Sequence, residues 1–218
     1  MQQTAAASVL LGQGYQGAVY RVETDDGPVI VKKVIGRGLL RSLRRAMLRR
    51  EHAVYQRLAG VNGVPGCRGL LGGEELVLDY VPGPSLREAD RPLADRGRFF
   101  DELLAIIQAV HAAGVAHGDL KRKDNILVGP GGHPVLIDFG TAVAMPPGAG
   151  AWRRWLFRQV ARIDLNAWVK LKYQRQDMPM DPGDLQYYRP SWLERTARLV
   201  RRTWRKLTLR SHRRDRRR

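Results

Sequence analysis

The stretch GQGYQGAVYRVE constrains the fold most strongly, because it sets three glycines at the turn of a β-hairpin. Gly12, Gly14 and Gly17 follow the spacing G-x-G-x-x-G, and the residues after them alternate as in a strand. Dinucleotide-binding folds use this spacing to open a helix and place an acid about 20 residues later. Here a strand follows, and Val34 and Ile35 stand near that later position. The sequence therefore predicts a glycine-rich hairpin.

The rest of the chain predicts an α+β protein, with strands early and helices late. Residues 37–60 form a basic helical pattern that ends at Gly60. Further patterns predict a hairpin over 70–86 with the turn GG, a helix over about 96–113, short strands NILV and PVLID, and a helix from about 152 onward.

The charge and the cysteine content of the chain limit which partners and which cellular compartment we expect. There are 38 Lys and Arg against 21 Asp and Glu, a net charge of +17, which favours an anionic partner: nucleic acid, phospholipid, phosphorylated glycolipid or acidic protein. Cys67 is the only cysteine, so a disulfide framework and a cysteine metal site are excluded within one chain. We see no membrane-spanning run and no signal peptide. We expect a cytoplasmic protein, with peripheral attachment to the inner membrane left open.

A lysine and a glutamate follow the glycine hairpin at positions that suit phosphate binding. Phosphate held by glycine backbone needs a fixed positive charge nearby, and Lys32 ends the predicted strand VIVK. Lys33 should point to the opposite face, because side chains alternate along a strand. Glu51, the one acid on the arginine-rich helix, is expected to hold Lys32 as an ion pair.

Three polar residues in the second half suit phosphoryl transfer. The reaction needs a carboxylate to orient the attacking hydroxyl, and Asp119 in HGDLK suits that task. It also needs oxygen ligands for Mg²⁺, for which Asn125 and Asp138 are the candidates. The apolar run PVLI puts Asp138 at the end of a buried strand, where a lone charge is costly without a metal or a partner.

Taken in order, these motifs resemble the protein-kinase-like superfamily across roughly residues 9–140. They are G-x-G-x-x-G-x-V, V-x-V-K, a helical Glu, HGDLK, NILV and DFG. The resemblance implies a bilobal α+β fold, with an antiparallel sheet and one helix in the N-lobe and a reduced, mostly helical C-lobe. The implied divisions are an N-lobe at 1–81, a C-lobe at 82–188 and a basic amphipathic tail at 189–218.

One spacing departs from the family pattern. The family places its metal-binding asparagine five residues after the catalytic aspartate, where this chain has Asp124, and Asn125 comes one later. We favour a one-residue insertion in KRKD and Asn125 as the ligand, with Asp124 as the open alternative. Lys121 stands where serine/threonine protein kinases carry a phosphate-contacting lysine. HGD in place of HRD resembles RIO kinases, sugar and lipopolysaccharide-core (InaA/Kdo-type) kinases, and antibiotic phosphotransferases.

The resemblance also implies residues around the adenine and behind the catalytic loop. Asp164 resembles the helical aspartate that braces the loop, with a helix N-cap as the alternative. The expected ATP-binding residues are Gly12, Gly14, Gly17, Val19 over the adenine, Lys32, Glu51, the hinge residues Leu78, Asp79 and Val81, and Leu127 beneath the adenine.

The segment after DFG is short for this family. No A-P-E motif follows, and Asp164 comes only 26 residues after Asp138. An ordinary peptide-docking platform is therefore not expected. This reduction resembles the RIO-like and lipopolysaccharide-kinase-like enzymes.

Aromatic residues interleave with arginine from residue 152 onward. Trp152, Trp155 and Phe157 suit a helix lying on anionic lipid, or stacking on nucleic acid, or a plain core with a solvated basic face. For Trp168 we expect the core. The tail carries an apolar stripe opposite its arginines, formed by Leu193, Ala197, Val200, Trp204 and Leu207.

Together these features predict an ATP- and Mg²⁺-dependent kinase, with Asp119 and Lys121 as its catalytic residues. The acceptor is expected to be a protein Ser/Thr hydroxyl. The alternative is a lipopolysaccharide-core sugar at the inner membrane face, so the acceptor partner is a protein or a glycolipid. A rival from another class is a nucleotide-regulated module that binds RNA or an anionic membrane through its tail.

Overall fold

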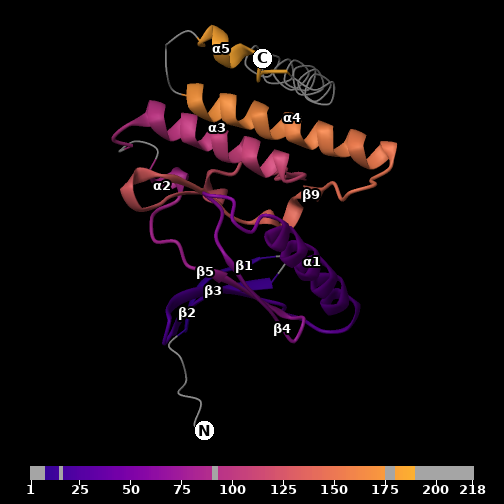
Figure 1. Cartoon of the computed structure of the whole chain (residues 1–218). Helices are drawn as coiled ribbons and strands as arrows, with labels where there is room; N and C mark the ends of the chain where they lie inside the picture. Colours follow the sequence, from indigo (N-terminus) through magenta and orange to yellow (C-terminus); the bar gives the residue numbers. More distant parts are fainter. Residues whose placement is uncertain (1–7, 15–16, 90–92, 175–179, 190–218) are drawn as a thin grey trace, which may run out of the picture.

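A computed structural model of the chain describes residues 8–14, 17–89, 93–174 and 180–189. Figure 1 shows a sheet flanked by one helix at the N-terminal end and two long helices side by side at the other. The segment 190–218, which holds nearly all of the predicted tail, lies outside the described residues.

The N-terminal part is a five-stranded antiparallel sheet in the order β1-β2-β3-β5-β4. The predicted hairpins are present, with turns at TDDG and at GG, where Gly72 and Gly73 have φ of 56° and 71°. In the register of β2 and β3, Val19 lies opposite Lys32. The strands are β1 (Ser8–Gly14), β2 (Gly17–Thr24), β3 (Gly27–Lys33), β4 (Cys67–Leu71) and β5 (Glu75–Asp79).

Helix α1 (Gly38–Arg57) packs against the sheet through its second half. Leu48, Val54 and Tyr55 are buried on one face, together with the carboxylate of Glu51. The first half carries exposed leucines and arginines. The helix therefore anchors one end in the core and leaves the other in solvent.

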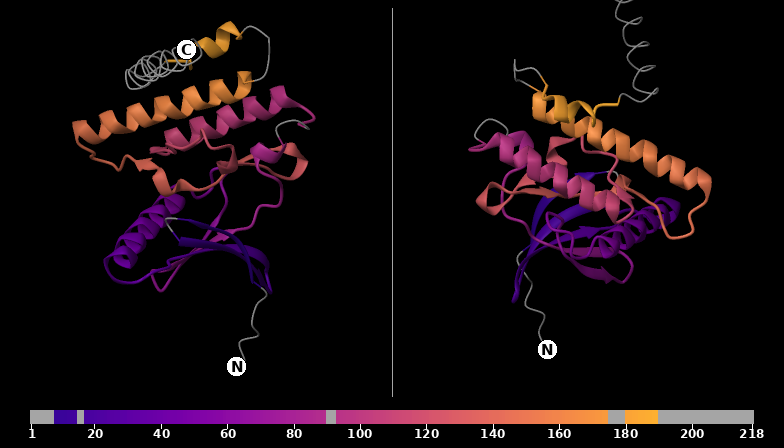
Figure 2. Two further views of the ribbon diagram at one scale, coloured as in Figure 1. Left: turned by 180° about the vertical axis from the view of Figure 1, so that it is seen from behind. Right: turned by 45° about the horizontal axis from the view of Figure 1, so that its top comes forward.

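The C-terminal part is built on α3 (Arg96–Ala112) and α4 (Ala151–Tyr173), which lie side by side in both views of Figure 2. Buried Trp168 of α4 donates its indole N–H to the carbonyl of Phe100 at 2.6 Å. The remaining elements are short: α2 (Leu86–Ala89), β6 (Val115–Ala116), η1 (Lys123–Asn125), β7 (Ile126–Val128), η2 (Pro130–Gly132), β8 (Pro134–Leu136), η3 (Phe139–Thr141), β9 (Val143–Ala144) and α5 (Pro182–Leu185).

One hydrophobic core runs through both parts, from Val34 and Leu48 on the sheet side to Trp168 and Leu171 on α4. The predicted bilobal α+β fold is confirmed. The proposed division after residue 81 falls between β5 and α2, and the division into 1–81, 82–188 and 189–218 stays a prediction. Among the described residues, no helix is both long and apolar enough to cross a membrane.

The hairpin β4–β5 offers a matched test of this core. Leu76 is fully buried and Leu71 is 60% exposed. We expect Leu76→Ala to lower the free energy of unfolding by about 2–5 kcal/mol, because it leaves a cavity. Leu71→Ala should change it by less than about 0.5 kcal/mol. Urea unfolding measures both, and equal losses would contradict this assignment of the core.

Candidate active site

Lys32 stands at the centre of a three-residue ion cluster. Its ammonium lies 2.5 Å from Oε1 of Glu51 on α1 and 2.8 Å from Oδ1 of Asp138, just after β8. The predicted pair with Glu51 is therefore present. Lys33 points the other way, as predicted, is half exposed and pairs with Glu75 at 2.6 Å.

Burial and charge act in opposite directions within this cluster. Burial alone would lower the pKa of the Lys32 ammonium, but the carboxylates of Glu51 and Asp138 outweigh it and raise that pKa. Burial raises the pKa of the Glu51 carboxyl. For Asp138, burial works against ionisation, yet Lys32 prevails and lowers its pKa. Lys32 thus stays charged and holds Asp138 ionised.

Asp138 adopts an unusual backbone conformation with a φ of 65°, the only positive value at a non-glycine described residue. Its N–H donates to the hydroxyl of Tyr55 at 3.3 Å. The next residue, Phe139, is buried and packs edge-on against Tyr55, with ring centroids 5.2 Å apart. These contacts fix where the Asp138 carboxylate points.

Asp164 braces the loop that carries Asp119. Its carboxylate is fully buried and accepts the backbone N–H groups of His117 and Gly118, each at 2.8 Å. A third contact, at 3.1 Å, joins it to Nε2 of His111. Because Asp164 lies in the middle of α4, the N-cap alternative is wrong.

Asn125 and Asp124 point in different directions. Asn125 is buried, and its amide donates to the carbonyl of Asp119 at 3.0 Å and to the Asp119 carboxylate at 3.4 Å. Asp124 instead forms a two-point ion pair with Arg87 of α2, at 2.6 and 2.7 Å. That pair lowers the pKa of the Asp124 carboxyl. The geometry therefore favours Asn125 over Asp124 as the residue facing the site.

Asp119 itself is accessible, with about 30% of its side chain exposed. Arg122 lies 3.9 Å from its carboxylate, a loose contact at the surface. The Asp119 carboxylate accepts from the Asn125 amide and is still partly exposed to solvent. A carboxylate that is fixed and accessible in this way suits contact with a substrate hydroxyl.

The glycine hairpin lies on the same sheet as Lys32. Gly12 and Gly14 belong to β1, and Gly17 begins β2 opposite Gly14. A side chain at Gly17 would collide with the backbone oxygen of Lys33, since its Cβ would lie 2.2 Å away. The tip of the hairpin, residues 15–16, is outside the described residues.

The predicted hinge joins β5 to α2. Leu78 is buried and Val81 is half-buried. Asp79 forms an ion pair with Arg68, with 2.7 Å between its Oδ1 and Nε of the arginine. Leu127 on β7 forms a bridge with Ser85 at the end of the same connector. Leu127 is thus joined to the connector that follows the expected hinge, and the roles of the hinge and adenine-floor residues remain predictions.

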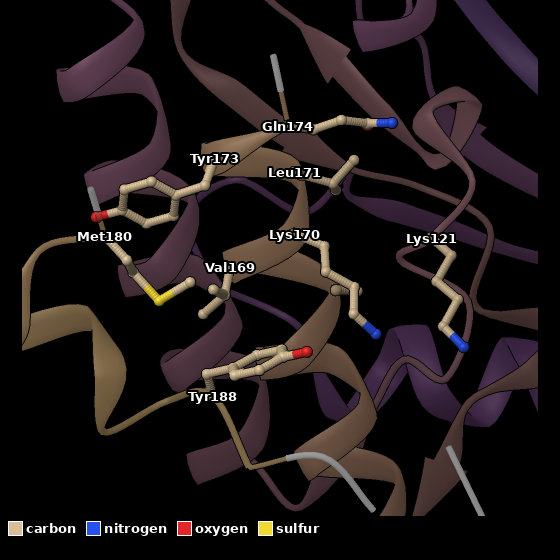
Figure 3. Close-up of a pocket in the computed structure, with 9 residues that line it drawn as sticks. Lys121, Val169, Lys170, Leu171, Tyr173, Gln174, Met180 and Tyr188 are labelled. Atoms are coloured by element: carbon tan, nitrogen blue, oxygen red, sulfur yellow. The ribbon is translucent and has the colours of Figure 1, made fainter. Parts of the chain in front are cut away.

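Lys121 lies on the α4 side of the loop. It is exposed and lines a pocket with Lys170, Met180 and Tyr188, and Figure 3 shows its ammonium near that of Lys170. Its predicted contact with a transferred phosphate stays a prediction.

Sequence reasoning missed Tyr55 and left the position of Phe157 open. Tyr55 stands four residues after Glu51, so helical spacing alone puts the two on one face and could have found it. For Phe157 the sequence left contact with lipid, contact with nucleic acid and a core position open, and the residue is buried and packs against His111, with ring centroids 6.2 Å apart. Trp168 is core, as expected.

The residues present fit a magnesium-bound nucleotide. Lys32, Glu51 and Asp138 carry one more negative than positive charge, and Asp138 is the exposed carboxylate, at 38%. Together with Asn125 it offers two oxygen donors, which suits Mg²⁺ because that ion keeps water and phosphate in its other positions. Within the described ranges there is no cluster of three acidic, His or Cys ligands.

Fold and site together show a two-lobed α+β domain with a Lys32–Glu51 pair and an accessible Asp119 on the loop that Asp164 braces. The family described as "Protein kinase domain" matches residues 6–156. The chain belongs to this family.

Three named relatives agree with that assignment. "Serine/threonine-protein kinase OXI1" of Arabidopsis thaliana is 28% identical over 63% of this chain and 37% of its own length. "Serine/threonine-protein kinase PkaB" of Streptomyces coelicolor is 32% identical over 62% and 36%. "CBL-interacting protein kinase 16" of Oryza sativa is 33% identical over 63% and 32%. The matched region therefore spans between 32% and 37% of these relatives.

Replacing Asp164 tests the brace. Asp164→Asn turns an amide N–H₂ toward the buried N–H of His117 or Gly118, so we expect a loss of about 1–3 kcal/mol in unfolding free energy. Hydrogen exchange at these two amides should quicken. The control is Asp101→Asn, whose carboxylate is 68% exposed and pairs with Lys172; it should cost less than about 1 kcal/mol. Unchanged exchange in Asp164→Asn would contradict the brace.

Proposed function

We propose that the chain is an ATP- and Mg²⁺-dependent serine/threonine protein kinase. The observation that carries the proposal is the Lys32–Glu51–Asp138 cluster, found together with an accessible Asp119 whose carbonyl and carboxylate accept from Asn125. Kinases place these groups around the phosphates because phosphoryl transfer is catalysed by positioning and charge neutralisation.

Each residue then has a distinct task. Lys32, kept charged by Glu51, binds the α- and β-phosphates, and the glycine hairpin with Val19 covers the nucleotide. Asp138 and Asn125 hold Mg²⁺, which neutralises charge on the phosphates when bound. Asp119 orients the acceptor hydroxyl and takes its proton. Lys121 contacts the transferred phosphate, and Leu78, Asp79, Val81 and Leu127 surround the adenine.

The acceptor we propose is a serine or threonine hydroxyl of a protein. Two of the relatives above are named serine/threonine-protein kinases, which supports this choice. We further propose an atypical, reduced enzyme of the RIO or lipopolysaccharide-core kind, because α4 begins at Ala151, thirteen residues after Asp138. So short a segment leaves little chain for an ordinary peptide-docking platform.

A sugar hydroxyl of a glycolipid is the second candidate acceptor. The observation that favours it is the group of exposed tryptophans and arginines at the start of α4, near the end of that short segment. It goes with a cytoplasmic enzyme working at the inner face of a membrane. Anionic membrane and nucleic acid contacts through the tail belong to the same set of proposals.

The first test of function measures the transfer of labelled γ-phosphate from ATP to an acceptor. Wild-type protein with Mg²⁺ and γ-labelled ATP should label the protein fraction of a cell extract. Asp119→Asn should reduce transfer roughly 10²–10⁴-fold, because the hydroxyl loses its base, while nucleotide binding stays. Label in the glycolipid fraction would replace the protein acceptor by a sugar. Equal transfer by the variant would refute the role of Asp119.

A second pair of variants separates the two candidate metal ligands. Asn125→Ala should raise the Mg²⁺ concentration for half-maximal transfer by roughly 10–100-fold, because an oxygen ligand is lost. Asp124→Ala should leave it unchanged, because that carboxylate faces Arg87 at the surface. Magnesium titrations at fixed ATP compare them. The reverse pattern would make Asp124 the ligand.

A further inference from the structure

Large apolar side chains are exposed at the start of α1 and at the start of α4. Leu39 is 90% exposed, Leu40 56% and Leu43 49%. On α4, Trp152 is 70% and Trp155 40% exposed, and their rings stack with centroids 4.6 Å apart. Exposed apolar groups gathered in this way mark an interaction surface.

The two helix ends lie on the same side of the molecule. In each view of Figures 1 and 2, α1 and the beginning of α4 lie on one side. Arg50 of α1 donates to the carbonyl of Ala142, and Arg153 of α4 donates to that of Ala144 at 3.2 Å. Both helices are therefore tied to the same short segment. Leu39 and Leu43 share a helix stripe with Arg50, because they lie eleven and seven residues before it.

The charge of this surface has one sign. Residues 36–50 contain six arginines and no acid, and residues 139–163 contain four arginines and no acid. The neighbouring carboxylate of Glu74 pairs with Arg41 and Arg45, at 2.6 and 2.9 Å. One nearby acid leaves a strong positive excess around the leucines and tryptophans.

We propose that this surface, called the α1–α4 face, docks on an anionic phospholipid bilayer. The face comprises Leu39, Leu40, Leu43, Trp152, Trp155 and the arginines of residues 36–50 and 139–163. Tryptophan and leucine enter the headgroup region of a bilayer, while arginine pairs with anionic headgroups. Nucleic acid is bound through charged contacts to its phosphates and aromatic stacking on its bases, and three exposed leucines provide neither contact. The proposal does not depend on kinase activity.

Vesicle binding tests the proposal with the full chain. Sedimentation with phosphatidylcholine vesicles should recover little protein, and vesicles containing phosphatidylglycerol should recover most of it. Binding should be lost at about 0.5 M salt, where charges are screened. The double variant Leu39→Glu and Leu43→Glu should bind at least about tenfold more weakly. The control Leu185→Glu, at a position 52% exposed on α5 across the molecule, should bind as wild type.

Tryptophan quenching distinguishes the α1–α4 face from other basic segments of the chain. In a chain with Trp192 and Trp204 replaced by phenylalanine, brominated phosphatidylcholine in anionic vesicles should quench emission from Trp152 and Trp155. Trp168 is buried and should contribute a constant background.

Three outcomes would overturn the proposal. One is binding without quenching, which would place the contact elsewhere in the chain. Another is unchanged binding by the double leucine variant. The third is an RNA oligonucleotide that displaces the protein from vesicles and whose own binding the leucine variant weakens, which would assign the face to nucleic acid.

Discussion

The contact between Lys32 and Glu51 is the interaction on which the site depends. A carboxylate that is 2% exposed is costly to bury, and only a charge at close range offsets that cost. The pair ties α1 to β3, and through Lys32 it also fixes Asp138, which follows β8 in the other half of the chain. Lys32 thus links helix α1, strand β3 and the segment after β8 through two ion pairs.

A second buried carboxylate, that of Asp164, fixes the loop that carries Asp119. Asp164 accepts two backbone N–H groups of the loop that carries Asp119, and Asn125 donates to the carbonyl of Asp119. The contacts of Asp164 satisfy two backbone N–H groups of this loop that need a hydrogen-bond partner. Asp138 of the ion cluster and Asp164 of the brace are 26 residues apart in the chain.

Much of this arrangement could be predicted from local sequence patterns. Glycine spacing, strand alternation and the motif order gave the sheet, its hairpins and the pairing of Lys32 with Glu51. Spacing favoured Asn125 but left Asp124 open, because the direction of the Asp124 side chain depends on its ion pair with Arg87 of α2, 37 residues earlier. The position of Phe157 stayed open for a similar reason, since its burial depends on contact with His111 of α3. Long-range partners decide such cases.

Calorimetric titration of Mg²⁺-ATP into the wild-type chain and into Lys32→Met tests the central claim most directly. The account predicts saturable binding that requires Mg²⁺, and a large loss of affinity in Lys32→Met, because the variant removes the charge that binds phosphate and holds Asp138. Circular dichroism should show that the variant keeps its secondary structure. Equal affinity in both proteins, or no binding by the folded wild type, would contradict the claim that this cluster forms a nucleotide site.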